Sequence, residues 1–477
     1  MKRIFTIIIS CIAYACVPSP DETNIFSSPQ PLSIYPDYRN VTIPCNIAPL
    51  NFMLSDSFSA VHVVAQSGNS IVRSDARGNK VIFNEKDWHQ LLRTSADASI
   101  CISIVAQCGS VWLSDTFSIS ISTDSIDPYV TYRLIEPGYE VWNEIAIEER
   151  CLENFYTRPL ALNKRLNNNC MNCHLHGQGG QTTLFHIRGK GGATFLCRNG
   201  ILRKTYLRSE QMRGGAVYGD IDCTGQFGVF STNNIIPALH STCNNRLEVY
   251  DTESDLCIAD FDNGQMILSP IVADTATLET FPCFSADGKQ VFYCSSPLPQ
   301  PVSPDNVRNL HYAILSISFD GTAWGTKTDT IWHSDNGSAS LLKASPNNKF
   351  IAFTHSAYGT FPIWHKESDL WIVGTDGSNP HPLTSANSDR SDSYHTWSSN
   401  SRWIVFASKR YDGQYGRVCI THIDTLGNAT KAFIMPQADP SYDIINLKSY
   451  NIPDISPCPA PYSIEQVEKI FWENNGK

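Results

Sequence analysis

The most constraining feature of the sequence is an internal repeat in its second half. Each copy is a polar turn that runs into alternating apolar residues: DCTGQFGVFST from Asp222, SADGKQVFYCS from Ser285, SPNNKFIAFTH from Ser345 and SSNSRWIVFAS from Ser398. The aromatic residue at the ninth position recurs at intervals of 63, 60 and 53 residues. Such repeats are typical of propeller blades, which bury their faces against neighbouring blades. The sequence therefore predicts an all-β propeller of about five to seven blades over residues 181–460.

Several strings also resemble a known family. SADGKQVFY and SPNNKFIAF resemble the S-P-D-G-K-x-I-x-F signature of TolB-type, WD40-like propeller repeats, and DLWIVGTDGSNPHPLT resembles the strand–turn–strand of that repeat. DPYVTYRLIEPGYEVWNE, NCMNCH, ETFPCFSADGK, YGTFPIWHKESDLW, SYHTWSSNSRWIVF and SYNIP are similar to bacterial envelope lipoproteins that join a TolB-like propeller to a C-x-x-C-H segment. The resemblance covers residues 127–457 and implies a six-bladed propeller and a haem, without an established reaction. Thr224-Gly225 and Asn347-Asn348 depart from the turn signature.

The segment CMNCH carries the strongest chemical signal. Haem c attachment needs two thiols separated by two residues, each forming a thioether to one vinyl group, and a histidine directly after them that reaches the iron. Cys170, Cys173 and His174 satisfy this spacing. Met212, in EQMRGGAVYGD, is the candidate sixth iron ligand, as a thioether within forty residues of the motif, and a packing or surface role is its alternative. His176 is too close to His174 to bind the opposite side of the same iron. The first functional hypothesis is an exported haem protein that transfers electrons or senses redox state.

Three other interpretations of this segment stay open. Zn²⁺ takes four nitrogen or sulfur ligands, which Cys170, Cys173, either His174 or His176, and His186 offer. A redox disulfide between the two cysteines is the second, although no thioredoxin-like βαβ pattern surrounds them. The third is a purely structural loop. The second functional hypothesis is accordingly a non-enzymatic propeller scaffold that binds an envelope protein or peptide, with the CMNCH loop structural or zinc-binding.

The N-terminal sequence MKRIFTIIISCIAYAC is typical of a secretory signal peptide over residues 1–16. Its apolar run is shorter than the roughly 20 residues that span a bilayer. A cysteine after small residues resembles the lipobox of bacterial lipoproteins, with Cys16 as the favoured lipidation site and Cys11 as the alternative, beside an ordinary cleaved signal. We expect residues 17–40 to be a flexible tether, and the protein to lie in the cell envelope, facing the periplasm, on a lipid anchor alone.

The remaining segments complete the expected domain organisation. Residues 41–125 alternate in short strands, which predicts a small Ig-like β-sandwich, interrupted by the helix-like string NEKDWHQLLRT. Apolar residues of segment 141–155 recur at helical spacing, so residues 126–180 are expected to form a short helical linker that ends in the CMNCH loop. Residues 461–477 are expected to form a C-terminal helical tail.

Composition excludes some functions and leaves the cysteines ambiguous. The net charge of -10 offers no electrostatic footprint for nucleic acid. Of the 16 cysteines, two would lie in the signal peptide or carry lipid, and export would place the others in an oxidising compartment. There, Cys101 and Cys108 are close enough in sequence to bridge a hairpin. Five others lie in apolar strand patterns, where cysteine acts as a small buried hydrophobe: Cys223, Cys257, Cys283, Cys294 and Cys419.

Two further clusters of polar residues give a weaker functional signal than CMNCH. PIWHKESDLW and SDSYHTW combine acids, histidines and tryptophans that could line a binding face at the central funnel, or make hydrogen bonds between blades: Trp364, His365, Glu367, Asp369, Trp371, His395 and Trp397. The sequence lacks G-x-S-x-G, H-E-x-x-H and a phosphate-binding glycine loop. The glycines of IRGKGGATF fit a tight hairpin better than a phosphate site. No catalytic constellation is therefore predicted.

Overall fold

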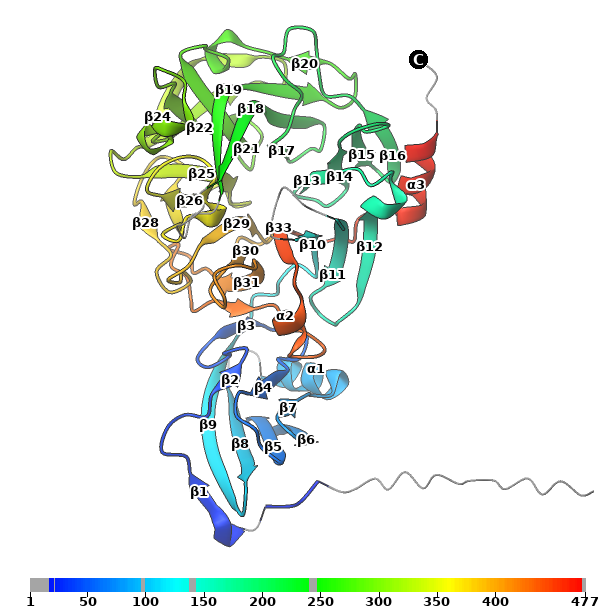
Figure 1. Cartoon of the computed structure of the whole chain (residues 1–477), viewed down its shortest axis with the longest axis vertical. Coiled ribbons are helices and arrows are strands. Elements are labelled where there is room, and N and C mark those ends of the chain that lie inside the picture. The colour runs from blue at the N-terminus through cyan, green and yellow to red at the C-terminus, as the bar shows by residue number, and fades with distance from the viewer. Residues whose placement is uncertain (1–16, 21, 96–98, 137–142, 240–246, 474–477) are drawn as a thin grey trace, which may run out of the picture.

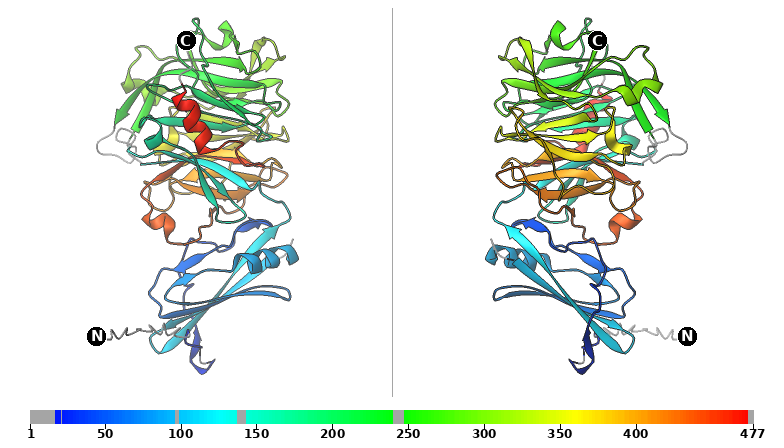
Figure 2. Two further views of the ribbon diagram at one scale, coloured as in Figure 1. Left: turned by 90° about the vertical axis from the view of Figure 1, so that its right-hand side faces the viewer. Right: turned by 90° about the vertical axis from the view of Figure 1, so that its left-hand side faces the viewer.

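The described part of the chain contains six antiparallel sheets of four strands each, arranged around a common centre (Figure 1). The structure is a computed structural model, and it describes residues 17–20, 22–95, 99–136, 143–239 and 247–473. This mostly-β arrangement is consistent with a TolB-like β-propeller. An N-terminal region with two further sheets lies below the propeller in Figure 2.

Each four-stranded sheet is one blade, and its inner strand lines the centre of the ring. From the inner strand outwards, blade 1 consists of β33 (Ser449–Ser456), β10 (Tyr129–Ile135), β11 (Ala146–Cys151) and β12 (Thr157–Leu162). Blade 2 consists of β13 (Met171–His176), β14 (Thr182–Ile187), β15 (Thr194–Arg198) and β16 (Ile201–Thr205). Blade 3 consists of β17 (Gly219–Ile221), β18 (Phe227–Leu239), β19 (Leu247–Asp260) and β20 (Met266–Ile267). Blade 4 consists of β21 (Thr277–Phe284), β22 (Gln290–Pro297), β23 (Ala313–Phe319) and β24 (Trp324–Trp332). Blade 5 consists of β25 (Ser338–Ala344), β26 (Phe350–Ser356), β27 (Asp369–Gly374) and β28 (His381–Pro382). Blade 6 consists of β29 (Asp392–Trp397), β30 (Trp403–Ser408), β31 (Arg417–His422) and β32 (Phe433–Ile434).

Blade 1 joins the two ends of the propeller. Its inner strand β33 comes from the C-terminal side of the sequence and pairs antiparallel with β10, the first propeller strand. The propeller therefore begins at Tyr129 and not at residue 181. Residues 126–180 supply most of blade 1 and the inner strand of blade 2, so the expectation of a helical linker is wrong.

The helix expected over segment 141–155 is strand β11, although residues 137–142 lie outside the described part. β11 pairs with β10 on one side and with β12 on the other, and five of its six residues are buried. A strand buried on both faces does not alternate, so periodicity cannot separate it from a buried helix. CMNCH likewise is not in a loop: its last four residues begin strand β13, and Cys170 directly precedes the strand.

The sequence repeat marks the turn between the first and second strands of blades 3 to 6. The first side chain of each turn accepts a hydrogen bond of 2.8–3.0 Å from a backbone N–H five residues later: Phe227 to Asp222, Gln290 to Ser285, Phe350 to Ser345 and Trp403 to Ser398. The fourth residue has a positive φ, which favours glycine: Gly225, Gly288, Asn348 and Ser401. One turn geometry thus recurs even where the S-P-D-G signature is incomplete.

The N-terminal region combines a six-stranded and a three-stranded sheet with one helix. Its strands are β1 (Ile25–Ser27), β3 (Thr42–Pro44), β5 (Ala60–Ser67), β6 (Ser70–Arg77), β8 (Ser99–Cys108) and β9 (Val111–Ser122) in the larger sheet, and β2 (Ile34–Tyr35), β4 (Phe52–Leu54) and β7 (Lys80–Val81) in the smaller. The helix predicted in NEKDWHQLLRT is confirmed as α1 (Glu85–Thr94), which begins after its cap Asn84. β1 and β3 both run parallel to β9. An Ig-like sandwich stays a prediction for this region.

Residues 25–40 are packed against the N-terminal sheets, so the expectation of a flexible tether is wrong for this stretch. They include β1 and β2, and Leu32, Ile34 and Tyr38 are buried in the core, Tyr38 completely. The Pro- and Ser-rich composition of this segment predicted a tether, although these apolar residues are separated by even-numbered intervals, as on one face of an extended chain. Residues 1–16 lie outside the described part, so a signal peptide and lipidation of Cys16 or Cys11 stay predictions.

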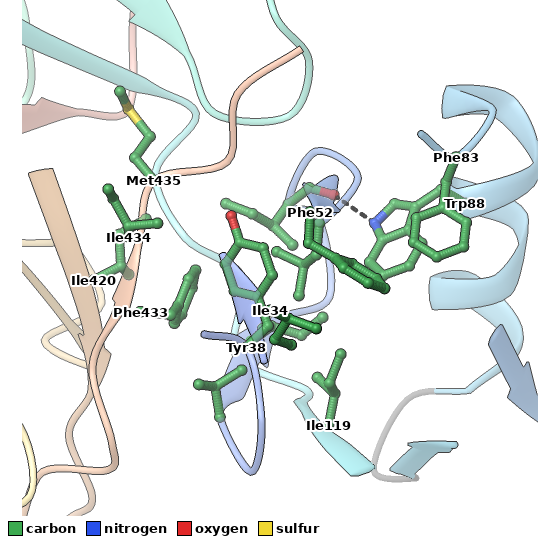
Figure 3. Close-up of a cluster of buried hydrophobic side chains, with 14 of the residues drawn as sticks. Ile34, Tyr38, Phe52, Phe83, Trp88, Ile119, Ile420, Phe433, Ile434 and Met435 are labelled. Atoms are coloured by element: carbon green, nitrogen blue, oxygen red, sulfur yellow. Dashed lines mark hydrogen bonds between the residues drawn. The ribbon is translucent and has the colours of Figure 1, made fainter. Parts of the chain in front are cut away.

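The N-terminal region and blade 6 share one hydrophobic core (Figure 3). Tyr38 and Phe433 make an edge-to-face contact with ring centroids 6.4 Å apart, and the buried Trp403 belongs to the same cluster. Polar contacts flank this core: Lys80 binds Asp439 at 2.8 Å. A continuous core of this kind resists independent movement of the two regions.

The remaining elements are short. They are α2 (Tyr442–Ile445), α3 (Ile464–Trp472) and the 3₁₀ turns η1 (Glu22–Asn24), η2 (Asn163–Arg165), η3 (Pro270–Val272), η4 (Pro304–Asn309) and η5 (Pro362–Trp364). α3 forms the expected C-terminal helix, begins with a capping box of Ser463 and Gln466, and packs beside β12 and β16 (Figure 1). Among the described residues, no helix has the length and apolar character to cross a bilayer.

The structure distinguishes the roles of cysteines for which the sequence left a disulfide or a buried position open. Cys101 and Cys108 lie seven residues apart on the single strand β8, about 23 Å apart at ~3.3 Å per residue, so they cannot bridge a hairpin. Four of the five cysteines expected to be buried are fully buried: Cys257, Cys283, Cys294 and Cys419. Cys223 is the exception, because it lies in the exposed turn after β17.

Candidate functional site

The inner strands of the propeller carry a recurrent irregularity at the central channel. In blades 1, 4, 5 and 6 the pairing register shifts at one residue with a positive φ of 48–57°. These residues are Ile452, Phe281, Leu341 and Tyr394, and all four line a cavity of about 70 Å³. β-Bulges often aim side chains at functional sites. We call these four residues the apolar ring.

CMNCH occupies the same irregular position in blade 2. The register of β13 shifts between Asn172 and Leu175, which brackets Cys173 and His174. His174 therefore corresponds to His395 of blade 6, and both line the cavity below the apolar ring. Burial lowers the pKa of each histidine to about 4, so both are neutral at pH 7.

A charged pair lies between this cavity and the opposite end of the channel. Lys343 Nζ is 2.8 Å from Asp220 Oδ1, and their side chains are 22% and 16% exposed. Asp454 accepts the backbone N–H of His176 at 2.8 Å. Burial would lower the pKa of Lys343, but Asp220 and Asp454 raise it. A second cavity, of about 60 Å³, lies beyond the pair and includes His176 and Trp397.

A larger groove opens between blades 2 and 3. It has a volume of about 550 Å³ and shares Tyr218 with the channel cavity. Its charged lining residues are Arg188 and Arg208. We call this cavity the arginine groove.

The described arrangement does not fit a haem at CMNCH. His174 is 2% exposed, and its Nε2 is 3.2 Å from the Thr131 carbonyl oxygen. The cavity that His174 lines has a volume of about 70 Å³, far below the ~300–1,000 Å³ of ordinary small-molecule sites. Met212 packs among apolar side chains of blades 2 and 3 and is not part of that cavity's lining. The side chain of Cys173 lies outside the described part, and Cys170 packs against the core of blades 1 and 2.

The zinc alternative meets a similar difficulty. His174 lines the cavity below the apolar ring, His176 lines the opposite end of the channel, and His186 lines the arginine groove. Ligands of one zinc ion must converge within about 2.0–2.3 Å of it. Within the described residues, no group of three or more His, Cys, Asp or Glu could hold a metal ion.

The PIWHKESDLW cluster lies apart from the channel. His365 is completely buried and binds both carboxylate oxygens of Glu248 at 2.9 Å, which links a loop of blade 5 to strand β19 of blade 3. Trp364 is buried, and Trp371 stacks on His355. This cluster thus matches the alternative of hydrogen bonding between blades, whereas His395 and Trp397 reach the channel.

Sequence reasoning missed the charged residues of the channel. Lys343 stands among apolar and small residues in SASLLKA, and a lone lysine in an inner-strand pattern is the signal that could have found it. Asp220 and Asp454 carried no comparable signal, because each precedes a turn or an end of a strand where acids are common.

His395→Leu tests the neutral histidines of the channel. Leucine occupies the corresponding position in blade 5, as Leu342. An unfolded histidine binds its proton near pH 6.5, whereas folded His395 binds it only near pH 4, so wild-type stability is lost as the pH falls through this window. Relative to wild type, the variant should gain about 2 kcal/mol on going from pH 7.5 to pH 5, measured by urea unfolding. An equal difference at both pH values would contradict the assignment.

The comparisons with known proteins concern the fold. No family model and no curated protein matches the chain. Among solved structures, it is similar to TolB from Acinetobacter baumannii, with 11% identity and a TM-score of 0.42 over 79% of this chain and 86% of that one. It is also similar to an oligogalacturonate lyase in complex with manganese (11%, 0.37, 64% and 73%) and to the β-propeller domain of the Trilobed protease from Pyrococcus furiosus (8%, 0.31, 68% and 78%). Likeness at these values supports neither an activity, a lipid anchor nor a haem.

Proposed function

We propose that the chain is a non-enzymatic scaffold whose propeller binds a protein or peptide partner at the mouth of the central channel. The apolar ring carries this proposal. Leu341, Tyr394 and Ile452 are partly exposed although they are large apolar or aromatic side chains in inner strands. Aromatic and aliphatic anchors in small pockets are typical of binding hot spots.

The size of the cavity supports a macromolecular partner over a small ligand. A volume of about 70 Å³ accommodates one side chain of a partner, whereas a free small molecule of ordinary size needs about 300 Å³ or more. The neutral histidines and the Lys343–Asp220 pair below the ring would add polar contacts at the bottom of the pocket. The predicted envelope location would supply protein partners.

Tyr394→Ala tests this function. Peptides selected from a random display library on the folded protein should bind the wild type and lose at least tenfold in affinity for the variant, because an anchor side chain loses its contact. Fluorescence anisotropy with a labelled selected peptide measures the loss. Tyr156→Ala, at a tyrosine that is 63% exposed in the turn after β11, is the matched control. Equal affinity of both variants would contradict binding at the ring.

A visible spectrum separates this proposal from the haem hypothesis. Protein from a host that attaches c-type haem should be colourless if the segment is structural. A reduced α-band, with haem stain retained after denaturation and lost in Cys170→Ser, would overturn the scaffold proposal in favour of electron transfer.

A further inference from the structure

The arginine groove concentrates positive charge on a protein that is negative overall. The net charge of the chain is -10, yet the described lining of the groove contains Arg188 and Arg208 and no carboxylate. Neither guanidinium forms an ion pair within the described residues. Two such groups without counter-ions create a local field that attracts an anion.

The CMNCH segment orients one of the two arginines. With its amide oxygen facing the guanidinium, Asn172 accepts hydrogen bonds from Arg188 Nε at 3.2 Å and from Nη2 at 3.0 Å. A guanidinium has five N–H donors, so three remain for a ligand. Asn172, the central residue of CMNCH, therefore has a structural role that does not require haem or zinc.

The groove is also large enough and suitably placed for an extended segment. Its volume of about 550 Å³ falls in the range of ~300–1,000 Å³ for ligand sites. Tyr218 lines both the groove and the cavity below the apolar ring, so the two sites adjoin. Tyr206, which is 71% exposed, adds an aromatic surface at the groove.

We propose that the arginine groove binds a carboxylate-bearing segment of the peptide partner, held by Arg188 and Arg208, next to the residue that enters the apolar ring. This inference rests on the proposed function. The planar fork of a guanidinium matches the two oxygens of a carboxylate, and bidentate pairs of this kind are among the strongest charge-assisted hydrogen bonds. Asp or Glu side chains of the partner would supply the carboxylates.

The first experiment uses a labelled hexaglutamate peptide and the intact protein. Anisotropy should show binding to the wild type and at least tenfold weaker binding of a labelled hexaglutamine peptide. Arg188→Gln and Arg208→Gln should each weaken hexaglutamate binding about tenfold or more. Both arginines are exposed, so the folded state should tolerate these changes. Arg73→Gln, at an exposed arginine of β6 in the N-terminal region, removes the same charge elsewhere and should leave the affinity unchanged.

The outcomes separate this inference from the proposed function. Equal losses for Arg73→Gln and the groove variants would show non-specific attraction and overturn the inference, as would displacement of the peptide by inorganic phosphate at the peptide's own concentration. Hexaglutamate binding that survives Tyr394→Ala but not Arg188→Gln supports the groove. If that result accompanies selected peptides that do not depend on the ring, the groove binds carboxylates while the proposed function at the channel mouth fails.

Discussion

Trp403→Ala is expected to lower the free energy of unfolding of the whole protein by about 3–5 kcal/mol. Trp403 is completely buried in the core shared by blade 6 and the N-terminal region. Its Nε1 donates a hydrogen bond of 3.2 Å to the Asp124 carbonyl oxygen, and its ring contacts His422 with centroids 4.8 Å apart. Alanine would leave a cavity where the two regions meet.

The measurement is chemical denaturation followed both by tryptophan fluorescence and by far-UV circular dichroism. Because one core spans both regions, wild-type transitions from the two probes should coincide. Trp472→Ala, at a tryptophan that is 61% exposed on α3, is the control and should cost no more than about 1 kcal/mol. Two separate wild-type transitions, or a loss at Trp403 no larger than at Trp472, would contradict the shared core.

The sequence predicted the propeller because the repeat records a physical constraint. Each turn needs a side-chain acceptor such as Ser285 and a residue that tolerates a positive φ, such as Gly288. Suitable residue types therefore recur at these positions of the sequence repeat. Blade 1 and the inner strand of blade 2 were not predicted as parts of the propeller, because they lack this turn pattern. Blade 1 is completed by β33, far away in sequence, and no local pattern reports such a pairing.

The candidate site was predictable only in part. CMNCH was identified as a distinctive segment. For His395 the sequence left open a place at the central funnel or a hydrogen bond between blades, and the structure has it in the lining of the channel cavity. The spacing of CMNCH could not show that His174 would be buried against the Thr131 carbonyl. Spacing in sequence predicts ligands for a shared metal only when the backbone turns them to one side, whereas successive side chains of a strand point to opposite faces.

Glu248→Gln is expected to remove about 3 kcal/mol of stability at pH 6–7. Burial alone would lower the pKa of His365, but its hydrogen bonds to Glu248 and Glu367 raise it from 6.5 to about 9. The raised pKa means that the folded state binds the proton more tightly than the unfolded chain. This contribution is therefore fully present below pH 6.5 and is lost as the pH rises through 9.

The pH dependence distinguishes the ion pair from simple packing. Urea unfolding of the wild type and Glu248→Gln should give free energies about 3 kcal/mol apart at pH 6 and nearly equal at pH 10, because His365 is neutral in both proteins there. Glu367→Gln is the matched control: Glu367 is 46% exposed and 3.4 Å from the same ring, so its loss should stay below about 1 kcal/mol. A difference that persists unchanged at pH 10 would assign the role of Glu248 to its shape and its hydrogen bond from Tyr358. In that case, blades 3 and 5 would be joined by packing and not by charge.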